Sequence, residues 1–150
     1  MNPTNIVFFL YTKAHLLDLS GAAQVFYEAN SFSSRKYRLH FVSINETITT
    51  EQGLQFANLT PMHKIHLNKN DMIVVVGIDF KSFVRGEMDV EVEKSKEWIK
   101  ENYHNGVYLS SNMHRRFDPC QNGIAKRKKL HRTMEVPGLC QEKFSQSQIP

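Results

Sequence analysis

Three residues next to apolar segments carry groups that could bind a ligand or exchange a proton: His15, Asp18 and Gly77. The Asp18 carboxylate could bind a ligand or exchange a proton, or it could accept hydrogen bonds from the free N–H groups at a helix start. Position alone leaves both interpretations of Asp18 open. Gly77 closes an apolar run, so its backbone could face a ligand. We expect His15 to be a surface residue rather than a base, and we take Asp18 and Gly77 as the candidate ligand-binding residues.

A metal site would have to use Cys120, His131 and Cys140, which all lie near the carboxyl end of the sequence. Zinc sites are marked by close pairs such as CxxC or HxxxH, and no such pair occurs among these residues. The two cysteines also do not make a disulfide framework. We therefore predict no metal and no cofactor.

The segments that must position Asp18 and Gly77 alternate between strand and helix patterns. Continuous apolar runs rich in β-branched and aromatic residues are typical of strands buried on both faces, and a 3.6-residue apolar period is typical of helices. A small hairpin is also expected, over 48–50 and 55–57, with Thr60 and Pro61 leaving it. The pattern predicts strands over residues 6–11, 37–43, 71–77 and 106–111, and helices over 16–30 and 87–103.

This order indicates an α/β fold with a parallel sheet and helices on both of its faces. Such sheets bind ligands beyond the carboxyl ends of their strands. The segments to consider are therefore those that follow Tyr11, Gly77 and Ser111.

Charge is distributed unevenly along the chain. Residues 1–111 hold 11 Lys and Arg against 12 Asp and Glu, a net charge of −1, whereas residues 112–150 hold 8 against 3, a net charge of +5. The basic excess that could suggest nucleic-acid binding is thus confined to the last segment. No window approaches the ~20 apolar residues of a membrane span, and the first residues lack the pattern of a signal peptide. We expect a cytoplasmic protein that has no membrane partner.

Residues 6–11, the Leu17-Asp18-Leu19-Ser20-Gly21 segment, Val25-Phe26, and residues 72–77 and 107–111 together resemble the ThiJ/PfpI superfamily. The sequence is similar in particular to the class I glutamine-amidotransferase-like domain at the front of AraC-type transcriptional regulators. The resemblance covers residues 6–111 and implies a flavodoxin-like three-layer sandwich. It also implies that Asp18 is the family's acidic position and that Gly77 contributes a backbone oxyanion donor.

The sequence departs from the family at the place where its nucleophile belongs. In the family, the strand that corresponds to residues 107–111 runs into an elbow of the form Cys-x-Gly-Ala, in which the helix N-terminus stabilises a thiolate. This chain continues Asn112-Met113-His114. Thr12-Lys13 and Gly21-Ala22 also replace the family's usual Pro-Gly and Gly-Pro. The resemblance therefore implies that no catalytic residue is present and that the chain is not an enzyme.

A shifted reading frame accounts for the break after Ser111. Met113-His114 must be encoded ATG-CAY, which contains the cysteine codon TGC one base later, and Met134-Glu135 must be encoded ATG-GAR, which contains the tryptophan codon TGG. Permitted codon choices give Cys-Thr-Gly-Ala from Met113, which matches the family's elbow. We therefore predict that residues 112–150 are an out-of-frame, disordered basic tail, and that residues 1–111 are a truncated ThiJ/PfpI-like domain.

The resemblance predicts a truncated, inactive ligand-sensing domain of an AraC-type regulator, which lacks both the nucleophile elbow and a DNA-binding region. The intact relative would bind a small molecule and form a homodimer. The alternative is a cysteine-dependent ThiJ/PfpI enzyme, a hydrolase or a glyoxalase-like protein, or an inactive fragment of one.

Overall fold

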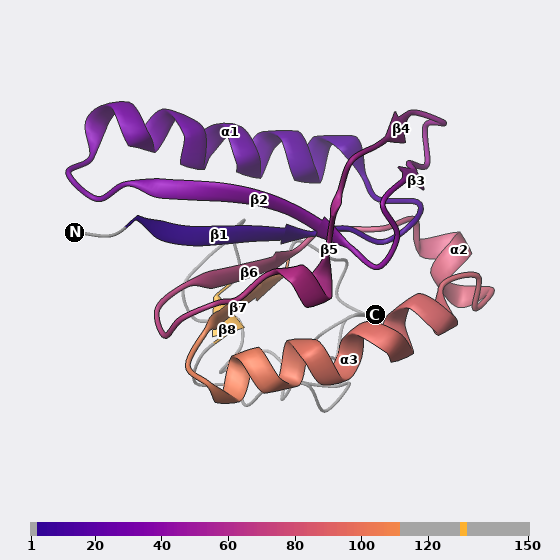
Figure 1. The fold of residues 1–150 in the computed structure, drawn as a ribbon. Helices are drawn as coiled ribbons and strands as arrows, with labels where there is room; N and C mark the ends of the chain where they lie inside the picture. Colours follow the sequence, from indigo (N-terminus) through magenta and orange to yellow (C-terminus); the bar gives the residue numbers. More distant parts are fainter. Residues whose placement is uncertain (1–2, 112–129, 132–150) are drawn as a thin grey trace, which may run out of the picture.

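The computed structural model describes residues 3–111 and 130–131, and the statements below concern these residues (Figure 1). Strands and helices alternate through most of this part of the chain. The elements are β1 (Thr4–Phe9), α1 (Leu16–Phe32), β2 (Tyr37–Ser43), β3 (Ile48–Thr49), β4 (Gln55–Phe56), β5 (Thr60–Pro61), the 3₁₀ helix Met62–Lys64, β6 (Met72–Val75), α2 (Phe80–Val84), α3 (Asp89–His104), β7 (Tyr108–Ser111) and β8 (Leu130–His131).

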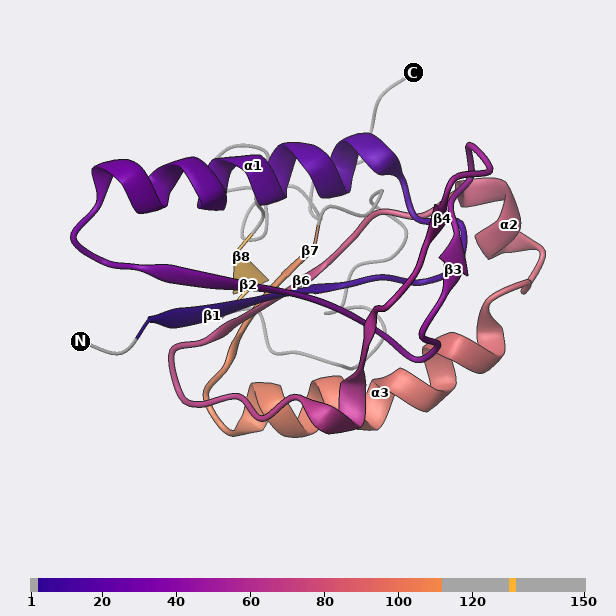
Figure 2. The ribbon, with the colours of Figure 1, turned by 45° about the horizontal axis from the view of Figure 1, so that its top comes forward.

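The central sheet has the strand order β5-β2-β1-β6-β7-β8, and all of its neighbouring strands are parallel. Helix α1 covers one face of the sheet and α3 covers the other (Figures 1 and 2). The predicted α/β, flavodoxin-like, three-layer arrangement is therefore confirmed. The predicted hairpin is present as the antiparallel pair β3 and β4.

One short part of the basic segment belongs to the sheet. In β8, Leu130 is the partner of Leu109 and His131 is the partner of Ser110. The other residues of 112–150, including Cys120 and Cys140, lie outside the described residues. The out-of-frame, disordered tail therefore stays a prediction.

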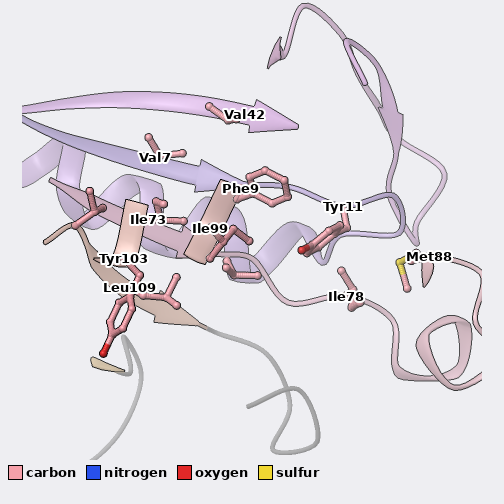
Figure 3. Packing of buried hydrophobic residues seen from close by; sticks show 12 residues of the cluster. Val7, Phe9, Tyr11, Val42, Ile73, Ile78, Met88, Ile99, Tyr103 and Leu109 are labelled. Atoms are coloured by element: carbon pink, nitrogen blue, oxygen red, sulfur yellow. The ribbon is translucent and has the colours of Figure 1, made fainter. Parts of the chain in front are cut away.

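The unbroken apolar run over residues 6–11 comprises most of β1 and the two residues that follow it. Alternate side chains of a strand point to opposite faces, and both faces of this sheet are covered. Val7, Phe9 and Tyr11 pack in the cluster beneath α3, with Ile99 and Leu109 (Figure 3). Their neighbours Ile6, Phe8 and Leu10 pack in the second cluster, toward α1. All six of these side chains are at most 1% exposed.

The Asn30 side chain ties the end of α1 to the start of β2. Its amide nitrogen donates to the Tyr37 carbonyl at 3.0 Å, and its amide oxygen accepts from the Tyr37 N–H at 2.7 Å. Because both backbone groups of Tyr37 are paired in this way, the amide takes the place of a neighbouring strand at this point of the sheet edge. The predicted helix over 16–30 was expected to end at Asn30, but α1 continues to Phe32.

A polar network holds the amino-terminal end of the sheet. Asp71, which is 5% exposed, accepts from the Asn5 N–H at 2.8 Å, from the Asn5 side-chain amide at 3.0 Å and from the Asn68 N–H at 2.8 Å. The Asn5 amide oxygen lies 3.0 Å from His40 Nε2. Since the Asn5 nitrogen already donates to Asp71, His40 Nε2 must be the donor in this bond. The network joins β1, β2 and the loop before β6.

His40 should make the stability of the protein depend on pH. Its pKa lies below the ordinary value of 6.5, mainly because of burial and next because of the Arg38 charge, while Asp71 acts in the opposite direction. The unfolded chain therefore takes up this proton at a higher pH than the folded chain does. The contribution of His40 is complete above pH 6.5 and is lost as the pH falls toward the folded pKa.

Urea denaturation between about pH 7.5 and pH 5 measures this effect. We expect His40→Gln to flatten the decrease, because glutamine can still donate to Asn5 but does not titrate. Identical slopes for the variant and the unmodified chain would show that His40 is not responsible.

No helix in the described part of the chain combines the length and the apolar composition that a bilayer crossing requires.

Candidate functional site

The candidate site lies at the carboxyl end of the sheet, where the loop after β1 meets the loop after β6. The His15 N–H donates to the Gly77 carbonyl at 2.8 Å, and the Asp79 N–H donates to the Lys13 carbonyl at 3.1 Å. Between them, Ala14 and Ile78 form an antiparallel bridge. Two loops that are far apart in the sequence are therefore fixed against each other by backbone hydrogen bonds.

The topology brings the two predicted site residues to the same edge. Asp18 lies in the first turn of α1, where its charge faces the positive end of the helix dipole. Its Oδ2 is 3.6 Å from His15 Nδ1, and its side chain is 26% exposed. Gly77 is buried, and its carbonyl accepts from His15. His15, expected to be a surface residue, thus connects the two by its side chain and its backbone.

Glu91 forms a second link at this edge, and no sequence pattern indicated it. The Thr12 N–H donates to Glu91 Oε2 at 2.9 Å, and the Thr12 hydroxyl donates to Oε1 at 2.6 Å. Glu91 belongs to the first turn of α3. Each carboxylate oxygen therefore receives one bond from the same residue of the loop after β1.

Beneath this link, Tyr11 and Ser95 form a buried pair. Their hydroxyl oxygens are 2.7 Å apart, and Ser95 also donates to the Val92 carbonyl at 3.0 Å, so the Tyr11 hydroxyl donates to Ser95. Burial raises the pKa of Tyr11 to about 12; the bond to Ser95 opposes this shift and the Glu91 charge adds to it. Tyr11 therefore stays protonated at neutral pH and acts as a fixed donor.

Asp79 begins the short helix α2. Its Oδ2 accepts from the Ser82 N–H at 2.7 Å, as an N-cap residue does. This backbone hydrogen bond is the main cause that lowers the Asp79 pKa, and the nearby charges of His15 and Lys81 lower it further. Asp79 therefore stays ionised at neutral pH.

Lys13 occupies an unusual backbone conformation in the loop after β1. Its φ angle is 65°, in the left-handed region that suits glycine. The strained loop is held by the hydrogen bond from the Lys13 N–H to the Thr49 carbonyl, at 2.9 Å. This conformation gives a physical reason for the glycine that the ThiJ/PfpI resemblance leads one to expect here.

We expect Lys13→Gly to raise the free energy of unfolding by about 1 kcal/mol. A left-handed conformation costs a non-glycine residue roughly 1–2 kcal/mol, and the greater freedom of glycine in the unfolded chain offsets only part of that gain. Urea denaturation followed by circular dichroism measures the change.

Lys13→Ala is the matched control for this substitution. It removes the exposed ion pair with Glu51, 4.0 Å away, but keeps the unfavourable φ angle. Its effect should stay within about 0.5 kcal/mol. An alanine variant as stable as the glycine variant would contradict the conformational explanation.

The position that corresponds to the nucleophile of the ThiJ/PfpI family lies directly after β7, outside the described residues. Strand β7 ends at Ser111 beside Val75 of β6, so the chain leaves the sheet at the edge that carries Asp18 and Gly77. The next residues, from Asn112, lie outside the described part, and residues 1–111 contain no cysteine. Within residues 3–111 and 130–131, no group of three His, Cys, Asp or Glu side chains is placed to hold a metal ion.

Solved structures share this architecture. An AraC family transcriptional regulator from Pseudomonas putida superposes with a TM-score of 0.60 at 12% identity, over 89% of this chain and 77% of its own. A ThiJ/PfpI family protein from Pseudomonas syringae gives 0.56 at 12% identity, over 74% of this chain and 42% of its own. Drosophila melanogaster DJ-1beta gives 0.52 at 16% identity, over 73% and 55%.

The chain has the fold of the ThiJ/PfpI and DJ-1 proteins. The resemblance seen in the sequence is thereby confirmed as a likeness of fold. No protein-family model and no curated protein sequence matches the chain. It spans less than half of the Pseudomonas syringae protein and about three quarters of the Pseudomonas putida regulator. At these identities the likeness concerns the ThiJ/PfpI fold alone, so the roles of Asp18 and Gly77 stay predictions.

Proposed function

We propose that this chain is the ligand-sensing domain of a cytoplasmic AraC-type transcriptional regulator and has no catalytic activity of its own. The observation that carries the proposal is the sequence after β7. At the point where a ThiJ/PfpI enzyme needs its nucleophilic cysteine, the chain reads Asn112-Met113-His114. The similarity to the Pseudomonas putida regulator, over 89% of this chain, supports the same assignment.

The sensed ligand would be a small molecule that binds at the carboxyl edge of the sheet, against the Asp18 carboxylate and the backbone at Gly77. Asp18 is half-buried at this edge, and the Gly77 loop is fixed by its bond to His15. In the intact regulator, ligand binding would act on a homodimer, and a separate region would read the DNA. A sensing domain of this kind needs an ordered ligand-binding edge that a small molecule can reach, but it does not need a nucleophilic thiolate.

An enzyme assay separates this proposal from the alternative. The purified 150-residue protein is tested for glyoxalase activity with methylglyoxal and for peptide hydrolysis, beside a matched Asp18→Ala variant. We expect both proteins to give the rate of the buffer alone. An activity that is present in the unmodified chain and lost in Asp18→Ala would favour the alternative, a hydrolase or glyoxalase-like enzyme, instead.

We further propose that residues 112–150 are read out of frame. Met113-His114 and Met134-Glu135 contain forced cysteine and tryptophan codons in the shifted frame, and the charge changes from −1 before Asn112 to +5 after it. Resequencing the locus through these codons and downstream tests the idea. An intact downstream reading frame in another phase must be found, and its absence rules out the frame change.

A further inference from the structure

We propose that the loop after β1 contains a binding site for a carboxylate, built from the Thr12 N–H and the Thr12 hydroxyl, and that the Glu91 side chain fills this site in the present structure. Its use in sensing rests on the proposed function, whereas its chemistry does not. The ligand class is a small carboxylate or a molecule that carries one. Such a ligand would displace Glu91 from the loop and release the first turn of α3.

The hydrogen bonds to Glu91 have the geometry of anion recognition. The two donors of Thr12 contact different oxygens, at 2.9 Å to Oε2 and 2.6 Å to Oε1. Hydrogen bonds to an ionised oxygen are shorter and about twice as strong as neutral ones. Both donors belong to one residue, so any carboxylate of suitable approach can receive the same pair of bonds.

The site does not depend on Glu91 for its shape. The residues that follow Thr12 are held by the bonds from Lys13 N–H to the Thr49 carbonyl and from His15 N–H to the Gly77 carbonyl. The Lys13 carbonyl accepts a further bond, from the Asp79 N–H. Removal of the Glu91 carboxylate should therefore leave the Thr12 donors in place, ready for another anion.

Solvent can reach the pair, and one positively charged side chain lies on the next residue of the loop. Thr12 and Glu91 are each only partly buried. This positively charged residue, Lys13, forms an ion pair with Glu51 at 4.0 Å, and both of these side chains are exposed. The site also lies after a parallel strand, at the edge where sheets of this type bind ligands.

Chemical rescue tests the proposal on the full 150-residue chain. The melting temperature of Glu91→Ala is measured by circular dichroism while sodium acetate is titrated, with sodium chloride at matched ionic strength as reference. We expect the variant to melt lower than the unmodified chain and acetate to restore more than half of the loss, because a ligand that binds only the folded state raises its stability. The unmodified chain should not respond, since its tethered carboxylate competes at high effective concentration.

Two variants identify the cause of any rescue. Asp89→Ala removes the other acidic group from the first turn of α3, and acetate should give it no more than chloride does. Thr12→Val combined with Glu91→Ala lacks the hydroxyl donor and should lose most of the rescue. Rescue that persists in the double variant, or that also occurs in Asp89→Ala, would assign the effect to general anion binding and overturn the proposal.

Folding of the variant does not limit the test. If Glu91→Ala shows no cooperative transition in buffer, it is refolded with acetate or with chloride, and a transition that returns only with acetate is the expected result. A Glu91→Ala protein whose melting or refolding is the same in both salts would show that the loop has no carboxylate site. Neither result depends on sensing activity, so failure here leaves the proposed function to its own assay.

Discussion

Phe9→Ala is expected to remove about 3–5 kcal/mol of stability, which is a large fraction of the ~5–15 kcal/mol that a domain has. Phe9 is fully buried in the cluster beneath α3 (Figure 3). Its ring centroid is 5.1 Å from that of Tyr11 and 5.8 Å from that of Trp98. Alanine would leave a cavity that these large neighbours can only partly fill. Urea denaturation, followed by the fluorescence of Trp98, the single tryptophan of the chain, measures the loss.

Phe41→Ala is the matched control for this prediction. The same atoms are removed from the other face of the sheet, where Phe41 is 39% exposed and its ring stacks on the Phe8 ring at 5.6 Å. We expect a loss of about 1 kcal/mol, because much of this ring is already in contact with water. Comparable losses for the two variants would mean that the cluster beneath α3 is not packed as described.

Asp71→Ala is expected to cost about 3 kcal/mol or more, although Asp71 is far from the candidate site. The carboxylate accepts three hydrogen bonds, two of them from backbone N–H groups, and the variant would leave those groups without their acceptor. The polar network joins three segments of the sheet, so its loss should loosen the start of β1. Urea denaturation measures the change, and hydrogen exchange at the Asn5 and Asn68 amides locates it.

Asn5→Ala serves as the comparison for Asp71. It removes the side-chain donor to Asp71 but keeps the Asn5 backbone donor, so we expect a loss of about 1 kcal/mol. The double variant should lose less than the sum of the two single losses, because the two residues share a bond. Strict additivity would show that the Asn5–Asp71 contact does not stabilise the fold.

Strands β1 and β6 were predictable because each is covered on both faces and so carries an unbroken apolar run, whereas β2 was predictable from its alternating pattern. The predicted strands over 6–11, 37–43, 71–77 and 106–111 correspond to β1, β2, β6 and β7. The parallel direction of the strands could be predicted as well, since alternation with helices implies a parallel sheet. Helix α3 begins at Asp89 rather than at residue 87.

The short elements were not predictable because long-range contacts define them. Thr60 and Pro61 were expected only to leave the hairpin, but they form β5 and pair with Val42 and Ser43. Helix α2 has five residues and begins at the Asp79 cap, which is too short for an apolar period to show. In both cases the sequence holds a local turn signal, and the partner that stabilises the segment lies elsewhere in the chain.

The candidate site was predictable in its place but not in its contacts. The rule for open α/β sheets located Asp18 and Gly77 at the same edge, and the backbone bond between His15 and Gly77 agrees with it. The bonds from Thr12 to Glu91 join residues 79 positions apart, so no local spacing could indicate them. Threonine and glutamate at such positions would ordinarily be assigned to a loop and to a solvated helix turn.

The two hydrogen bonds between the Asn30 side-chain amide and the Tyr37 backbone fix the length of the connection between α1 and β2. Residues 31–36 must therefore span a fixed distance between Asn30 in the helix and Tyr37 in the strand. The Lys36 ammonium, which donates to the Asn30 and Ser33 carbonyls, also holds this turn together. An added or deleted residue in this turn would place a neighbour of Tyr37 opposite the amide and turn the alternating faces of β2 over. Length variation among relatives of this chain should therefore be absent from this turn and accumulate in other connections.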